Sequence, residues 1–170
     1  MNKTMLSGPV LLPDAQIVDA TVQIEGGQVA AVTRGADPAA DFTTRGVIAP
    51  GMIDLQLNGG WGHDFTSDGR TVAAVAARLP ATGVTSFVPT VITSPWALYE
   101  QRLAEIAAAS REARGAQVLG VHLEGPFLNP NCSGAHDPAL LRPIDLAAFA
   151  GWIDHPLVRI VTLAPELPAA

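Results

Sequence analysis

The chain has 170 residues, of which 48% are hydrophobic and 15% are charged. This composition excludes a disordered chain and indicates a compact protein with a buried core. The formal net charge of −6 argues against a nucleic-acid partner, because an acidic surface repels the phosphate backbone.

The cysteine content and the apolar runs bear on the cellular compartment. Cys132 is the only cysteine, so no disulfide can form within the chain. No run approaches the roughly 18 apolar residues that a membrane-spanning helix needs. Residues 5–12 are apolar but broken by Pro9, which makes a poor signal peptide. We therefore expect a soluble, cytoplasmic protein without a membrane partner.

Two regions follow one another along the chain. Residues 1–48 predict a small β layer, in which strands at 17–22 and 29–33 flank the tight-turn pair Gly26-Gly27. From residue 49 to residue 170, predicted strands alternate with predicted helices. The strands cover 53–58, 85–90, 118–124 and 158–164; the helices cover 71–79, a segment from an N-cap at Ser94 to a stop at Gly115, and 146–153.

Strand–helix alternation predicts parallel βαβ units and an α/β fold. A doubly wound sheet and a barrel both have this pattern. The chain has no GxGxxG after its first such strand and no P-loop, and polar residues lie on the strands themselves. Polar strand ends build the active sites of barrels, so we favour an incomplete barrel, the first four strands of a (β/α)8 TIM-like barrel, preceded by the small β layer.

The strand predicted at 53–58 places Asp54, Gln56 and Asn58 on one face. Three polar side chains on one face of a core strand must be paired or must face a wet cavity, because their desolvation is costly. A half-exposed edge strand is the alternative. The glycine-rich segment 59–62 that follows would let backbone approach a ligand.

The strand predicted at 118–124 has a second polar face, formed by His122 and Glu124. Glu124 ends the strand, where a barrel has its catalytic rim, and a carboxylate there suits Zn²⁺ or another divalent ion. A structural carboxylate paired with His122 or an arginine is an equally good interpretation. His136 lies in the loop that follows, where substrate contacts are common and exposed histidines are commoner.

Five segments occur together in one order: APGMIDLQLNG (49–59), GVTSFVPTVIT (83–93), GVHLEGPFLN (120–129), GAH (134–136) and TLAPE (162–166). Together they resemble the N-acetylglucosamine-6-phosphate deacetylase family of the amidohydrolase superfamily. The resemblance covers essentially the whole chain. It implies a metal-bearing (β/α)8 barrel, a small β-sandwich built from both chain ends, and in the whole enzyme a homodimer.

The same resemblance implies an activity and a set of site residues. The family hydrolyses the N-acetyl amide of a phosphorylated amino sugar, giving acetate and glucosamine 6-phosphate. By motif, Glu124 matches the metal-binding glutamate, and Ala135 and His136 match the pair that contacts the sugar. Gln56 and Asn58 stand where many amidohydrolases have His-x-His, which implies one metal ion, expected to be Zn²⁺, with Gln56 near it or its water.

The family's remaining parts find no match in this chain. They are two metal-binding histidines, a catalytic aspartate that acts as general base, and the phosphate-binding residues, all expected beyond Ala170. A whole (β/α)8 barrel takes roughly 250 residues. We therefore expect a truncated chain that carries no catalytic residue and is inactive by itself.

Two other hypotheses remain open. Another amidohydrolase, of the dihydroorotase or imidase type, would have His-x-His on its first strand, where Gln56 and Asn58 stand here. A non-catalytic half-barrel that assembles with itself or with a complementary chain would form a defined dimer without metal.

Overall fold

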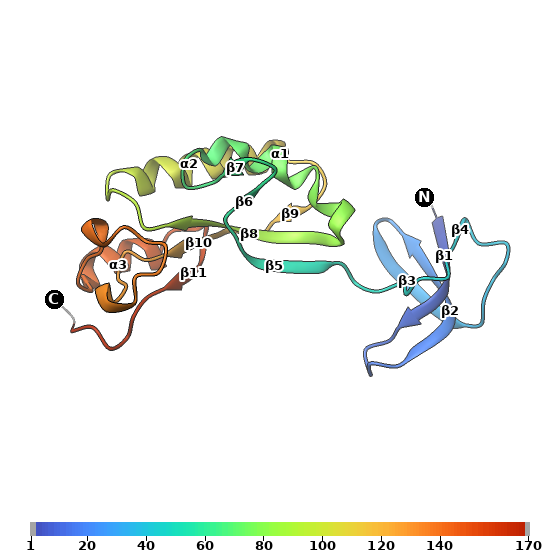
Figure 1. Ribbon diagram of the computed structural model, residues 1–170. Coiled ribbons are helices and arrows are strands. Elements are labelled where there is room, and N and C mark those ends of the chain that lie inside the picture. Colours follow the sequence, from blue (N-terminus) through green and yellow to red (C-terminus); the bar gives the residue numbers. More distant parts are fainter. Residues whose placement is uncertain (1–2, 169–170) are drawn as a thin grey trace. The chain divides into compact units, whose positions relative to one another are not determined.

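The computed structural model of the protein describes residues 3–168. The chain divides into two compact units, Met1–Pro50 and Gly51–Ala170, shown in Figure 1. Within residues 3–168, no helix is both long and apolar enough to cross a membrane.

The first unit is one four-stranded sheet in the order β3-β2-β1-β4. Its strands are β1 (Lys3–Leu11), β2 (Ile17–Glu25), β3 (Gln28–Arg34) and β4 (Phe42–Thr43). Gly26 and Gly27 both have positive φ, 58° and 78°, as a two-residue hairpin turn requires. The predicted hairpin is therefore confirmed. Val10, Ala20 and Val22 form the buried cluster of this unit.

The second unit is built on a parallel sheet in the order β11-β10-β8-β5, so the predicted α/β class is confirmed. The sheet lies beneath α1 and α2 in the view of Figure 1. The strands of this sheet are β5 (Met52–Leu57), β8 (Val84–Ile92), β10 (Val121–Glu124) and β11 (Val158–Thr162); β9 (Gln117–Val118) pairs with β8, and β6 (Gly59–Gly60) and β7 (His63–Asp64) form a small hairpin. The helices are α1 (Val72–Ala76), α2 (Leu98–Glu112) and α3 (Leu146–Ile153). The 3-10 turns are η1 (Gly69–Thr71), η2 (Leu79–Thr82), η3 (Pro130–Cys132) and η4 (Pro138–Leu140).

The strand predicted at 118–124 is broken into β9 and β10. Gly120 lies between them with φ 154°, and a Cβ there would fall 2.3 Å from Cγ of Arg159 and 2.7 Å from the carbonyl oxygen of Leu157. This close approach to the segment that begins β11 requires glycine. The interruption at Gly120 makes β10, which carries His122 and Glu124, a strand separate from β9.

Two helix predictions differ from the structure. The helix predicted at 71–79 is a five-residue α1 between the 3-10 turns η1 and η2. The cap predicted at Ser94 is wrong, because α2 begins at Leu98. The Ser94 hydroxyl donates to the carbonyl oxygen of Ile92 at 2.9 Å, while its backbone N–H donates to Oη of Tyr99 at 3.2 Å. Ser94 therefore closes the end of β8 and does not cap the helix.

Aromatic side chains hold α2 and α3 together. The rings of Trp96 and Trp152 are stacked with centroids 4.8 Å apart, and Tyr99 packs at 4.8 Å from Trp152. Burial raises the pKa of Tyr99 to about 12. Phe127, from the loop after β10, is fully buried against the same rings. This cluster fixes the loop that carries His136 at its base.

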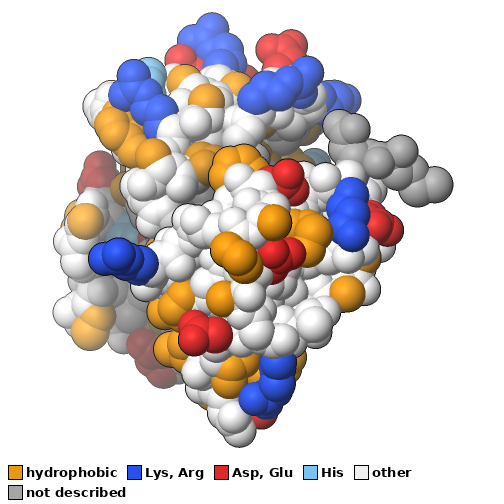
Figure 2. Space-filling view, turned by 90° about the vertical axis from the view of Figure 1, so that its right-hand side faces the viewer, with side chains coloured by type: hydrophobic (Ala, Val, Ile, Leu, Met, Phe, Trp, Pro, Cys, Tyr) orange, Lys and Arg blue, Asp and Glu red, His pale blue; other side chains and the backbone are white. Residues whose placement is uncertain are grey.

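Apolar side chains also reach the surface in both units. They include Val29, Val32 and Phe42 in the first unit and Met52, Ile53 and Leu55 in the second. Figure 2 shows one face of the molecule, where hydrophobic side chains lie between charged ones. In the second unit these residues belong to β5, the outermost strand of the described sheet.

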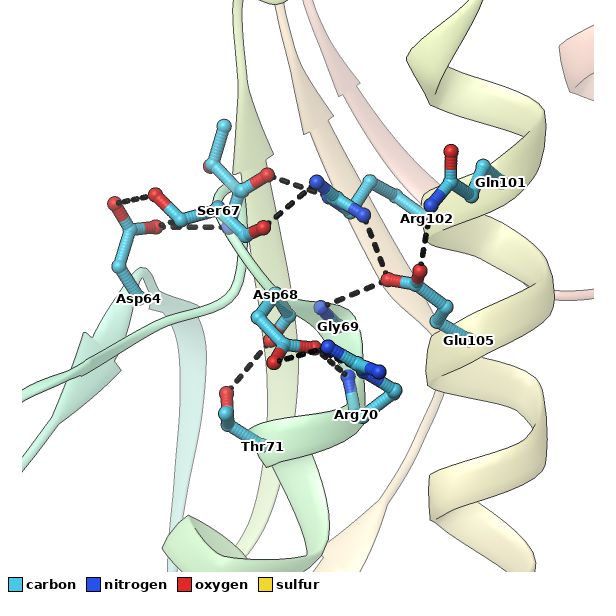
Figure 3. Close-up of polar contacts among 10 residues, drawn as sticks. Asp64, Ser67, Asp68, Gly69, Arg70, Thr71, Gln101, Arg102 and Glu105 are labelled. Atoms are coloured by element: carbon cyan, nitrogen blue, oxygen red, sulfur yellow. Dashed lines mark hydrogen bonds and ion pairs between the residues drawn. The ribbon is translucent and has the colours of Figure 1, made fainter.

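A polar network fastens the segment after β7 to α2 (Figure 3). Arg102 donates from Nε to the carbonyl oxygen of Thr66 at 2.6 Å and from Nη2 to that of Ser67 at 2.7 Å. Its Nη1 lies 2.7 Å from Oε2 of Glu105, which also accepts from the backbone N–H of Gly69. Both side chains are mostly buried, with exposed fractions of 11% and 18%.

Replacing Arg102 by Met should destabilise the second unit by about 1–3 kcal/mol, because two carbonyl oxygens lose a charged donor and Glu105 loses its cation. Urea denaturation followed by tryptophan fluorescence measures this change, since Trp61, Trp96 and Trp152 all lie in the second unit. Arg70→Met is the matched control. Its pair with Asp68 is exposed, and the transition should stay in place. Equal effects of the two substitutions would contradict this assignment.

Candidate active site

Glu124, His136 and Thr93 lie together where β8, β10 and β11 end. Because these strands are parallel, their carboxyl ends meet at one edge of the sheet. Glu124, the last residue of β10, is paired with Ile92 on β8 and with Thr162 on β11. The rim is therefore formed by the ends of three neighbouring strands and by the loop 125–143 that follows β10.

Glu124 and His136 face each other at this rim. Oε1 of Glu124 lies 3.8 Å from Nε2 of His136, and the exposed side-chain fractions are 20% and 9%. The structure thus brings together the two residues that the sequence singled out for the metal and for the substrate. Ala135, the other predicted substrate contact, precedes His136 in the loop and is exposed.

Thr93 joins these two residues from the segment after β8. Its Oγ1 lies 2.8 Å from Nδ1 of His136 and 3.4 Å from the carbonyl oxygen of Glu124. Gly125 leaves the space for this hydroxyl, because a Cβ there would fall 2.2 Å from Thr93 Oγ1 and φ is 82°. The Gly125–Pro126 peptide bond is cis. The absence of a side chain at Gly125 therefore lets the backbone after Glu124 pass close to Thr93.

His122 lies beneath the rim and is not paired with Glu124 by a hydrogen bond. Its Nδ1 is 3.2 Å from Oγ1 of Thr90 on β8, and its Nε2 is 2.8 Å from Oγ1 of Thr162 on β11. The ring is 2% exposed. Each threonine hydroxyl can donate or accept, so a neutral imidazole satisfies both of its nitrogens across three strands.

Gln56 does not join this cluster. The register shifts between Asp54 and Leu57, so the strict alternation predicted for this strand is interrupted. Leu57 is paired with Pro89, whereas Glu124 is paired with Ile92, which places Gln56 farther from the rim along the sheet. Its backbone N–H donates to Oδ1 of Asp54 at 3.0 Å. β5 lies at one edge of the described sheet, and its apolar residues Met52, Ile53 and Leu55 are more than half exposed.

Two side chains at the rim are of kinds that can bind a metal ion. Glu124 offers a carboxylate and His136 an imidazole, both of which bind zinc in proteins, but zinc takes three or four protein ligands. Among residues 3–168, no three His, Cys, Asp or Glu side chains lie together as a metal-binding group. The described residues therefore fit one side of such a site and do not complete it.

The sequence did not indicate three threonines that contact His122 or His136, namely Thr90, Thr93 and Thr162. Each lies in a segment that carries the family resemblance, and Thr90 is fully buried within an apolar strand. The hydroxyl of Thr90 inside the apolar run VPTVI needs a hydrogen-bond partner when it is buried. That requirement alone could have indicated from the sequence that Thr90 makes a specific contact. The partner itself comes from another strand and is not visible in the local pattern.

The state of His122 should make stability depend on pH. Burial lowers the pKa of His122 below its ordinary value of 6.5, and the Glu124 carboxylate opposes part of this change. The unfolded chain then binds the proton at higher pH than the folded chain does. The stabilisation by neutral His122 is present above pH 6.5 and is lost as the pH falls below that value.

The urea midpoint measured by tryptophan fluorescence should therefore fall as the pH is lowered from about 7.5 to about 5.5. His122→Gln lacks the titrating ring and should show a smaller fall, although its midpoint at the upper pH is itself lower. The same pH dependence in both proteins would rule out His122 as its source.

Comparison with known proteins shows which class of proteins the chain resembles. No protein-family profile matches the chain. A substituted N-acetyl-D-glucosamine-6-phosphate deacetylase from Mycobacterium smegmatis, solved in complex with N-acetyl-D-glucosamine-6-phosphate, has the same fold over 98% of this chain. The TM-score is 0.83 and the sequence identity is 30%, and the chain covers 45% of that protein. The class of proteins that this chain resembles is thus the sugar-phosphate deacetylases.

Sequence similarity narrows the class. The human N-acetylglucosamine-6-phosphate deacetylase is 49% identical over an alignment of 144 residues, and the match covers 79% of this chain and 34% of that protein. An N-acetylgalactosamine-6-phosphate deacetylase from Escherichia coli O157:H7 is 33% identical along the whole chain, which spans 46% of it. The chain is therefore similar to part of N-acetylglucosamine-6-phosphate deacetylases, as the sequence motifs predicted, and spans about a third to a half of its relatives' length.

Proposed function

We propose that this chain forms one wall of the active site of an N-acetylglucosamine-6-phosphate deacetylase. The observation that carries the proposal is the contact of Glu124 with His136, 3.8 Å apart at the carboxyl ends of parallel strands. Both residues lie within the segments by which the chain resembles this family. The reaction is hydrolysis of the N-acetyl amide, which gives acetate and glucosamine 6-phosphate.

The proposal includes an architecture. The parallel strands β5, β8, β10 and β11 are taken as the first four strands of a (β/α)8 barrel, and β1–β4 as part of a small β-sandwich. Two observations support this assignment. The four strands follow one another in the sheet in their chain order, and Met52, Ile53 and Leu55 on the outermost strand are more than half exposed. Exposed apolar residues on an outer strand are expected to be covered by further structure.

The chemistry assigns a different task to each residue. A divalent ion, by proposal Zn²⁺, supplies water of lowered pKa and polarises the amide carbonyl when it is bound. Glu124 is proposed as one of its ligands. His136 and Ala135 are proposed to contact the sugar, with the imidazole oriented by Thr93. Gln56 is proposed to approach the metal or its water from β5, a position that it takes only if the end of β5 is turned toward the rim.

A chimera tests the function. The 170 residues replace the matched part of the Mycobacterium smegmatis deacetylase, and acetate release is measured with both acetylated amino-sugar 6-phosphates. We expect hydrolysis of the glucosamine derivative by the chimera and none by the isolated 170 residues with Zn²⁺, because Glu124 alone provides too few ligands. A folded, metal-loaded chimera without deacetylase activity would refute the proposal. Faster hydrolysis of the galactosamine derivative would change the proposed substrate.

Glu124→Gln in the active chimera should lower kcat by at least about 100-fold, because an amide replaces the charged ligand while the shape is kept. Metal content, measured by mass spectrometry after dialysis, should fall with it. Glu112→Gln is a matched control, since its carboxylate is exposed at the end of α2. Full metal content and activity in Glu124→Gln would exclude it as a ligand.

A further inference from the structure

Thr93 contacts His136 through two different groups, its side-chain hydroxyl and its backbone N–H. Its hydroxyl Oγ1 lies 2.8 Å from Nδ1 of His136, and its backbone N–H donates to the same nitrogen at 3.4 Å. Both come from one residue at the end of β8, 43 positions before His136 in the chain. The contact therefore reports how the loop 125–143 sits against the strand.

The backbone donor decides which ring nitrogen carries the hydrogen. A backbone N–H always has its hydrogen, so the nitrogen it faces has to offer a lone pair. Nδ1 of His136 is then an acceptor, and the single hydrogen of the Thr93 hydroxyl goes to it at 2.8 Å rather than to the carbonyl oxygen of Glu124 at 3.4 Å. In a neutral imidazole the other nitrogen carries the hydrogen. Nε2, which lies 3.8 Å from Oε1 of Glu124, is thus the donor.

We propose that Thr93 is a positioning residue that holds His136 in the Nε2–H tautomer and so presents a hydrogen-bond donor beside Glu124. The tautomer follows from the contacts of the chain itself. Its use, donation of this hydrogen bond to an oxygen atom of the substrate, rests on the proposed deacetylase function. Thr93 acts through His136 and need not touch the substrate.

The surroundings keep Thr93 in place. The residue is 6% exposed, and its Oγ1 also lies 3.4 Å from the carbonyl oxygen of Glu124. The adjoining Ile92 is held by Thr66, whose Oγ1 accepts the Ile92 backbone N–H at 3.0 Å. Gly125 faces the hydroxyl without a side chain. A buried hydroxyl with these neighbours has little freedom to turn away from His136.

The test reads the tautomer directly in the 170-residue chain. Histidine is labelled with ¹⁵N, and long-range ¹H–¹⁵N correlation spectra are recorded at an alkaline pH at which free imidazole is neutral. The chain has four histidines, and His136→Gln identifies the signals of His136. We expect a protonated Nε2 and an unprotonated Nδ1. A protonated Nδ1 in the unsubstituted chain would overturn the proposal without any further variant.

Two substitutions then test Thr93. Thr93→Val keeps the shape and the backbone N–H but removes the hydroxyl, and the ratio of Nε2–H to Nδ1–H should fall about fivefold, as expected for the loss of one net hydrogen bond. Thr93→Ser keeps the hydroxyl and should keep the ratio. An unchanged ratio in Thr93→Val would overturn the role of the side chain.

The chimera separates this inference from the proposed function. In an active chimera, Thr93→Val should lower kcat/KM about tenfold and Thr93→Ser should restore it, in parallel with the tautomer ratio. If the unsubstituted chimera is inactive, the function fails while the spectra still decide the tautomer. If the chimera is active and Thr93→Val changes neither ratio nor rate, the function stands and the positioning role is refuted.

Discussion

The arrangement of the second unit depends on the pairing of one short strand, β10. This strand has four residues, yet it is bonded to β8 on one side and to β11 on the other, and His122 bridges all three through Thr90 and Thr162. A side chain that satisfies both of its nitrogens on neighbouring strands fixes their relative register. Glu124 follows two residues later on the same strand, so the position of its carboxylate at the rim depends on the contacts of the buried His122 ring.

The loop after β10 is the second determinant of the site. It is long and irregular, but it is held at its base by Phe127 in the aromatic cluster and at its tip by the contact of His136 with Thr93. Segments this long without regular structure are commonly functional. Here the loop returns a histidine to a strand end that lies far away in the sequence. The residues proposed for catalysis and binding thus come from different elements.

The sequence was most informative where the local backbone conformation or position restricts the choice to one type of residue. Gly26-Gly27 predicted a hairpin because both positions need positive φ, and the structure has that turn. Glu124 and His136 were predictable because they are polar groups at a strand end and in the following loop, and they meet. Ser94 misled, because a serine before proline is typical of a helix start, while its hydroxyl here bonds back to Ile92. Such competition depends on neighbours that no local pattern reveals.

The first polar strand shows the same limit. Asp54, Gln56 and Asn58 alternate in the sequence, but the shift in register between Asp54 and Leu57 breaks the alternation in space. An interruption of this kind is set by pairing with β8 and by what lies beyond the exposed side of β5. The period of two was therefore a sound guide to the presence of the strand and a poor guide to the direction of its side chains.

Gly125 has a consequence for how this protein can vary. The missing Cβ at that position and the hydroxyl at Thr93 occupy the same volume, 2.2 Å apart if both were present. Substitutions at positions 93 and 125 are therefore coupled. A larger residue at position 125 would demand a smaller one at position 93 and a different backbone angle as well. Gly125 cannot change alone, and a lineage that has lost the threonine hydroxyl still meets the positive φ at position 125.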